Sequence, residues 1–145
     1  MVKNLQIHSE FVLIKKRIVH KLISSLIKEF DLTISFLSIN FIKSFELREI
    51  NKKHLNHDYE TDVITFNYSK KEKDIDGEIL ISFEEAAINA KKYRVTHQKE
   101  LLRLVIHGVL HLLHFDDKNE KRKKIMKQME NKLINKYYFT LLAGR

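Results

Sequence analysis

Residues 101–117 of the chain read LLRLVIHGVLHLLHFDD. Apolar residues surround two histidines in this stretch at helical spacing, and Thr96 just upstream is a favourable N-cap residue. The pattern predicts a largely buried helix that begins after Thr96 and ends near Leu113. A helix that is apolar on most sides packs in the interior of a domain, so we expect this one to be central.

Strand and helix patterns alternate along the rest of the chain. Strands are predicted at Val2–His8, Leu32–Ile39, Val63–Tyr68 and Glu78–Ser82, the last two as a hairpin around a charged loop. Further helices are predicted at Phe11–Phe30 (capped by Ser9), Ser44–Lys53, Phe83–Tyr93 and Glu120–Tyr138. The apolar line of the last helix is expected to be Ile125, Met129, Leu133 and Ile134. The expectation is one α+β domain over residues 1–145, in which about five helices pack on a small mixed sheet of about four strands.

Composition narrows the class of protein. With 43% hydrophobic and 32% charged residues, the 145-residue chain suits one globular domain, and it has no apolar run near the roughly 18 residues of a membrane span. No secretion signal is evident, so we expect a cytoplasmic protein without a membrane partner. Because cysteine is absent, a metal site would use imidazole and carboxylate ligands. The net charge of +8 favours nucleic acid as a partner, although a lysine-rich solvated surface explains it equally well.

Two histidines in the central stretch are spaced for metal binding. His107 and His111 lie four residues apart, which places both imidazoles on one helical face. A third ligand has to come from beyond the helix, and Asp117 lies ten residues after His107. Extended zinc metalloprotease motifs use this spacing. However, those enzymes carry a glutamate directly after the first histidine as general base, and here that residue is Gly108, which argues against peptide hydrolysis. A glycine within a helix also suggests close approach of a neighbouring element or of substrate.

These residues resemble the YbeY family of endoribonucleases, whose pattern is H-G-x-L-H-L-x-G-Y-D-H. Three further blocks of the family pattern match this chain in the order in which the family has them, at Glu46–Asn51, Thr61–Phe66 and Gly77–Ser82. The resemblance implies one Zn²⁺ ion held by His107, His111 and Asp117, which would activate a water and thereby make these residues catalytic. It also implies that the protein cuts single-stranded RNA, matures the 3′ end of small-subunit (16S) rRNA and acts in ribosome quality control. The small ribosomal subunit is then a partner, and DNA is not an expected substrate.

The sequence departs from the family pattern at three positions. Asp117 stands where the third histidine ligand is usual, and a carboxylate would make a zinc-bound water less acidic. His114 stands at the turn glycine, where a positive φ is expected; it is also an alternative ligand. Leu55 stands where the family has an arginine linked to activity, with His57 as a possible stand-in. Asp62 and the preceding Asp58 are either functional carboxylates or turn residues.

Basic residues supply the predicted contacts to RNA. Lys52, Lys53, Lys70 and Lys71 could hold the phosphates that flank the cut, although for each single lysine a solvated surface role is the better explanation. Two rival functions stay open. One is a ribosome-associated RNA-binding assembly factor with a mainly structural metal, which the leucine at position 55 favours. The other is a metal hydrolase that acts on small phosphoesters.

Overall fold

The computed structural model describes residues 1–11, 14–56 and 61–143, with the side chains of the last helix described as far as Tyr138. Its four strands form one mixed sheet in the order β1-β2-β4-β3. Strands β1 (Leu5–Ser9), β2 (Thr33–Ile42) and β4 (Asp74–Ser82) run parallel to one another. Strand β3 (Val63–Asn67) pairs antiparallel with β4, so the predicted hairpin is confirmed.

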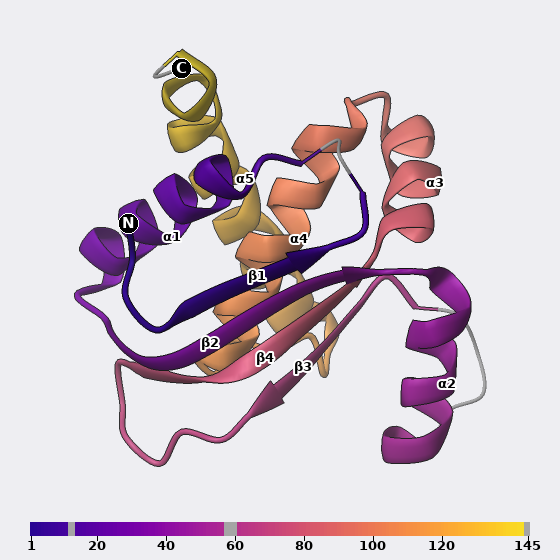
Figure 1. Ribbon diagram of the computed structural model, residues 1–145, viewed down its shortest axis with the longest axis horizontal. Helices are drawn as coiled ribbons and strands as arrows, with labels where there is room; N and C mark the ends of the chain where they lie inside the picture. Colours follow the sequence, from indigo (N-terminus) through magenta and orange to yellow (C-terminus); the bar gives the residue numbers. More distant parts are fainter. Residues whose placement is uncertain (12–13, 57–60, 144–145) are drawn as a thin grey trace.

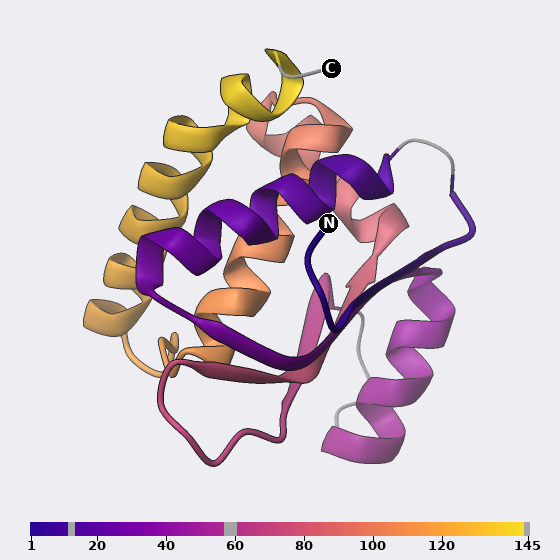
Figure 2. The same ribbon diagram turned by 60° about the vertical axis from the view of Figure 1, so that its left-hand side comes forward.

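The described part of the chain also forms five helices, as expected. They are α1 (Lys16–Phe30), α2 (Ser44–Leu55), α3 (Phe83–Tyr93), α4 (His97–Leu112) and α5 (Glu120–Ala143). Figures 1 and 2 show α1, α4 and α5 together on one face of the sheet, with α4 running behind the strands and α2 apart at one end. The α+β fold class is confirmed, as is the central position of the helix predicted between Thr96 and Leu113, which is α4. None of the described helices is long and apolar enough to cross a membrane.

Helix α1 begins later than predicted. Ser9 does not cap it, because the Ser9 hydroxyl instead accepts a hydrogen bond from the Phe11 backbone N–H and donates one to the Phe11 carbonyl, each at 3.0 Å. Such a local turn competes with helix formation. The Phe11 ring stacks on Phe83, with ring centroids 3.9 Å apart, and the helix starts only after Lys15, which makes no side-chain cap.

The buried face of α5 also differs from the predicted one. Ile125 is 43% exposed, whereas Met126, Leu133 and Ile134 are buried in the core. The buried face therefore includes Met126 instead of Ile125. It also includes a charged residue, Glu130, which is only 3% exposed. The predicted buried face contained apolar residues only, so the prediction did not include this carboxylate.

Gly108 allows α4 to lie close to the sheet. A Cβ atom at this position would lie 2.7 Å from Cγ2 and 2.9 Å from Cδ1 of Ile79, a fully buried residue of β4. The predicted close approach is therefore confirmed, and the neighbour is a strand of the same domain. Because α4 carries both histidines, this contact fixes their depth relative to the sheet.

Candidate metal centre

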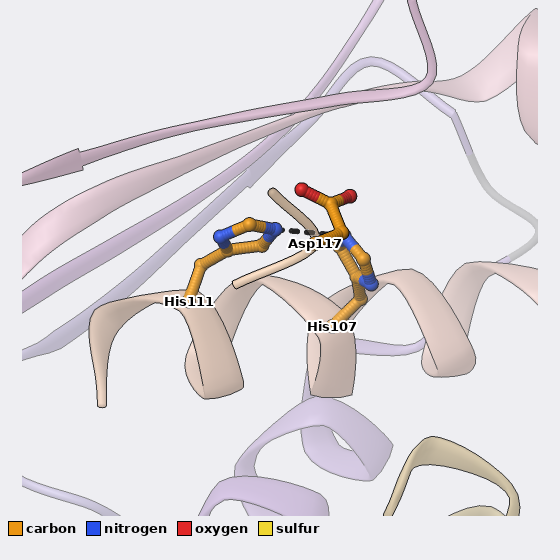
Figure 3. Close-up of side chains that lie close together, drawn as sticks. All are labelled: His107, His111 and Asp117. Carbon is orange, nitrogen blue, oxygen red and sulfur yellow. Dashed lines mark hydrogen bonds between the residues drawn. The ribbon is translucent and has the colours of Figure 1, made fainter. Parts of the chain in front are cut away.

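His107 and His111 lie on successive turns of α4, on the side that faces β3 and the loop after the helix. Figure 3 shows both imidazoles rising from the same face of the helix. Their Nε2 atoms face each other at 3.0 Å, and both residues are half-buried. Two nitrogen atoms placed this way can bind the same metal ion, as the spacing predicted.

The end of α4 brings Asp117 back over these histidines. His114 adopts φ 74°, and hydrogen bonds run from its N–H to the His111 carbonyl and from the Phe115 N–H to the Leu110 carbonyl, each at 3.0 Å. These two bonds form a Schellman motif, which ends a helix by reversing the chain. The predicted positive φ at position 114 is confirmed, and histidine tolerates this conformation better than most residues.

Asp117 completes a group of three possible metal ligands. One ligand atom each from His107, His111 and Asp117 lies within 4.8 Å of the other two. In the part of the chain that the structure describes, no other such group of ligands occurs. His114 is not a member, because α4 ends before it and the left-handed turn removes it from the helical face of His111.

The donor set fits a divalent transition metal. Two imidazole nitrogens and one carboxylate oxygen are ligands that Zn²⁺ accepts, and three protein ligands leave a coordination position open. The three residues come from a rigid helix and the loop directly after it, so little rearrangement is needed to bring their ligand atoms together.

A buried carboxylate contacts His107 through Nδ1, the ring nitrogen that does not face His111. Glu130 of α5 forms a hydrogen bond with His107 Nδ1, and its second oxygen accepts one from Arg103. Because an ionised carboxylate can only accept, Nδ1 carries a proton, so Nε2, the atom that faces His111, is the nitrogen left to bind a metal. Metal-binding histidines commonly have such a carboxylate partner.

Arg103 links this carboxylate to a second one. Its Nε and Nη2 donate to the two oxygens of the buried Glu100, at 2.8 and 2.5 Å. Asn89 of α3 extends the network, because its Nδ2 donates to Glu100 at 3.4 Å and to Asp62 at 2.9 Å. The network therefore runs from the start of β3 to His107, and every carboxylate in it has a partner.

The ionisation of this network follows from burial and from these neighbours. Burial raises the pKa of Glu130, but the hydrogen bonds and charges of His107 and Arg103 outweigh burial, so its pKa lies below the ordinary value. Burial and the neighbouring His107 lower the pKa of His111. At neutral pH, His111 is therefore neutral and Glu130 is ionised, which are the protonation states that favour a metal ligand and its carboxylate partner.

Two grooves meet at the candidate metal centre. One, of about 300 Å³, lies beside β3 and the end of α2, and its lining includes Leu55 and Asp62. The other, of about 350 Å³, lies between α4 and α5. His107 and Asp117 line both grooves and therefore lie where the two grooves join, while His111 lines the groove beside β3.

The other residues singled out in the sequence have different locations. Leu55 is 42% exposed and faces the first groove, as an arginine there would. The side chains of Lys52, Lys53, Lys70 and Lys71 are exposed and line neither groove. Asp62 lies in the first groove and is bonded to Asn89, so it is more than a turn residue. His57 and Asp58 lie outside the described residues.

Sequence reasoning overlooked Glu100, Arg103 and Glu130. The signal for the first two was present, because positions 100, 103, 107 and 111 form a polar stripe along an otherwise apolar helix. Glu130 stands among Met126, Leu133 and Ile134 at helical spacing, and a carboxylate inside an apolar stripe needs a buried partner. The identity of that partner is not visible in the sequence.

Comparison with known proteins agrees with this geometry. The family model described as endoribonuclease YbeY matches residues 3–138. Endoribonuclease YbeY of Azobacteroides pseudotrichonymphae genomovar. CFP2 is 36% identical over 128 residues, which covers 88% of this chain and 91% of the relative. Endoribonuclease YbeY of Amoebophilus asiaticus (strain 5a2) is 35% identical over 132 residues, 87% of this chain and 90% of the relative.

A solved structure shares the fold over nearly the whole chain. The solution structure of TM1509 from Thermotoga maritima superimposes with a TM-score of 0.65 and 26% sequence identity, covering 97% of this chain and 93% of that one. At this coverage the match includes the sheet, helix α4 with its two histidines, and the loop that carries Asp117. With this fold and relatives of this similarity, the chain belongs to the YbeY family of endoribonucleases and is a hydrolase of RNA.

Proposed function

We propose that this protein is a zinc-dependent, single-strand-specific endoribonuclease in which His107, His111 and Asp117 hold the metal. The observation that carries the proposal is that one ligand atom from each of these three residues lies within 4.8 Å of the other two, beside the point where two grooves meet. Two histidines that met on the surface by chance would not be expected to have a buried carboxylate bonded to one of them, or grooves that lead to them from two sides.

Each residue of the site has a defined task in this proposal. His107 and His111 would bind the metal through their Nε2 atoms, and Asp117 through a carboxylate oxygen. Glu130 keeps the proton of His107 on Nδ1. Bound Zn²⁺ would supply Lewis-acid chemistry, which lowers the pKa of water and offsets negative charge on phosphoryl oxygens. The two grooves would receive the RNA on either side of the scissile phosphate.

For the biological substrate, we propose 16S rRNA near its 3′ end, as part of the small ribosomal subunit, in rRNA maturation and ribosome quality control in the cytoplasm. Family membership supports this role. The net charge of +8 also suits a partner whose surface is polyanionic.

The test compares two histidine variants. His107→Ala is expected to lose bound zinc, measured by elemental analysis, and to lose cleavage of a labelled single-stranded RNA. His114→Asn is the matched control, because it removes a neighbouring histidine outside the ligand group and asparagine tolerates positive φ. Full cleavage by a metal-free His107→Ala protein would disprove the assignment.

A second candidate role is RNA binding during ribosome assembly, with a mainly structural metal. The observation that favours it is Leu55, which puts an apolar side chain in the groove where the family resemblance predicts an arginine. Zinc-loaded protein mixed with labelled single-stranded RNA separates the two roles: stoichiometric binding without cleavage supports assembly, and turnover supports the nuclease.

A further inference from the structure

The groove between α4 and α5 has a different chemical character from the groove that contains Leu55. Val95, Met126 and Ile134 give it an apolar lining, while the side chains of Lys99, Lys123 and Lys127 lie around it. Its volume of about 350 Å³ is at the small end of the roughly 300–1,000 Å³ typical of ligand pockets. An apolar floor with cationic side chains at its edge suits a ligand that has a flat apolar part and a negative charge.

Tyr93 adds an aromatic surface to this groove. The residue ends α3 and is 53% exposed, so its ring is accessible to a ligand in the groove. The Nζ atoms of Lys92 and Lys127 lie 5.5 and 5.9 Å from the centre of its ring. Both cations lie over the ring, and single-stranded nucleic-acid sites combine such rings and cations. A base that stacks on Tyr93 would take the place of a lysine over the ring, and the displaced cation would meet a phosphate.

The groove is also continuous with the candidate metal centre. His107 and Asp117 line it at one end, and the same two residues line the groove beside β3. An RNA strand whose phosphate lies at the centre therefore extends into one groove on each side. Asn131 and Asn135 of α5 add amide donors and acceptors to the lining, which suits the polar edge of a base.

We propose that the α4–α5 groove is a nucleotide-binding subsite for single-stranded RNA, in which Tyr93 stacks on a base and Lys123 and Lys127 contact the adjacent phosphates. The proposal rests on the proposed nuclease function. It adds where the protein binds the RNA strand on one side of the cleaved phosphodiester. These residues differ from the lysines predicted from the sequence, which line neither groove.

The first test replaces the ring. Affinity is measured by fluorescence anisotropy with a fluorescein-labelled single-stranded RNA and metal-free protein, so that no cleavage occurs. Tyr93→Ala should raise the Kd about 10-fold, while Tyr93→Phe, which keeps the stacking surface, should stay within about twofold. In zinc-loaded enzyme, Tyr93→Ala should raise KM by a similar factor and change kcat little.

The second test replaces charges. The double variant Lys123→Ala/Lys127→Ala should lower the salt dependence of binding, with the slope of log K against log salt falling by about 1.4 for two lost phosphate contacts. The control Lys121→Ala/Lys124→Ala removes the same charge from the same helix at positions that do not line the groove, and should keep the parent slope. Melting temperatures establish that each variant is folded.

The outcomes separate the two proposals. If the parent binds and cleaves RNA while Tyr93→Ala matches it, or if both lysine pairs change the slope equally, the groove proposal is overturned and the nuclease assignment stands. If Tyr93→Phe loses as much affinity as Tyr93→Ala, stacking is refuted. If the parent itself neither binds nor cleaves single-stranded RNA, both proposals fail.

Discussion

Glu130 lies on α5, while the histidine that it contacts lies on α4. It is 3% exposed and accepts hydrogen bonds from both His107 and Arg103. A buried carboxylate without such partners would cost several kcal/mol, so these contacts also fix how the two helices pack. The residue therefore keeps a proton on His107 Nδ1 and fixes the orientation of the ring.

Replacing this carboxylate tests its influence on the metal. Glu130→Gln is expected to weaken zinc affinity by about 10- to 100-fold, because the amide no longer holds the Nδ1 proton as firmly. Competition with a chromophoric chelator measures the affinity, and cleavage should recover at high zinc. Glu120→Gln removes an exposed charge from the same helix and should retain parental affinity. Equal affinity in both variants would contradict a positioning role.

Leu55 offers a test by gain of function. It faces the groove beside β3 together with His107, His111 and Asp117. Leu55→Arg should lower the KM for single-stranded RNA by roughly 10-fold, since a hydrogen bond to a charged group contributes about 1.5–3 kcal/mol. Leu55→Met is the control, with similar size and no charge. A KM that Leu55→Arg leaves unchanged would show that substrate phosphates do not reach this position.

Among the elements, the packing of α4 on β4 depends on Gly108. Glycine within a helix costs about 1 kcal/mol relative to alanine, so the sequence alone makes Gly108→Ala look stabilising. The contact with Ile79 opposes this, because β-branched Ile79 is buried and its Cγ2 would lie 2.7 Å from the new methyl group.

Gly108→Ala is therefore expected to destabilise the fold, with about 1–3 kcal/mol of overpacking exceeding the gain in helix propensity. Urea unfolding measures the change in the free energy of unfolding. In a double-mutant cycle, Ile79→Val should relieve part of the clash, so the pair should be less destabilised than the sum of the single variants. Strict additivity would show that the two residues do not compete for space.

Asp74 stabilises β2 at an irregular point. Its carboxylate accepts hydrogen bonds from the hydroxyls of Ser35 and Thr33, both at 2.7 Å, where the register between β2 and β4 shifts. These bonds, that of Ser35 first, lower the pKa of Asp74 below its ordinary 3.8. A lowered pKa means stabilisation that is present above the ordinary value and lost as the pH falls through the folded value.

The melting temperature of Asp74→Asn should accordingly lie below that of the parent at neutral pH, and the difference should shrink once the pH falls below 3.8. Scanning calorimetry of metal-free protein across this range measures it. Glu72→Gln, which removes an exposed charge from the loop just before β4, should follow the parent at every pH. A difference that grows on acidification would contradict the sign of the shift.

For the whole molecule, the candidate metal centre joins parts that come together only on folding. Its ligands lie on α4 and on the loop before α5, while Glu130 supports them from α5 itself. A ligand that binds only the native arrangement stabilises it in proportion to its concentration. The metal should therefore act on global stability as well as on chemistry.

Zinc at about 100 times its dissociation constant should stabilise the parent by about 2.7 kcal/mol, which corresponds to a melting temperature several degrees higher. Removal of the metal with EDTA should reverse the rise, as seen by thermal unfolding. His107→Ala should show no rise and His114→Asn the parental one. A rise of the same size in His107→Ala would place the bound zinc elsewhere.

Much of this protein is predictable from local sequence. The boundaries of α3, the Thr96 cap of α4, the β3–β4 hairpin and the pairing of His107 with His111 all follow from periodicity and capping, because each depends on neighbours within a few residues. The positive φ at His114 was predicted from the family pattern in the same stretch.

Contacts between distant segments are what local patterns could not predict. The late start of α1 accompanies a turn at Ser9 whose Phe11 ring stacks on the distant Phe83. The buried face of α5 includes Glu130, which meets Arg103 and His107 of another helix. The α4–α5 groove likewise exists only once those helices pack. Periodicity shows that a residue is turned inward, but the atom it meets there is determined by the packing of elements far apart along the chain.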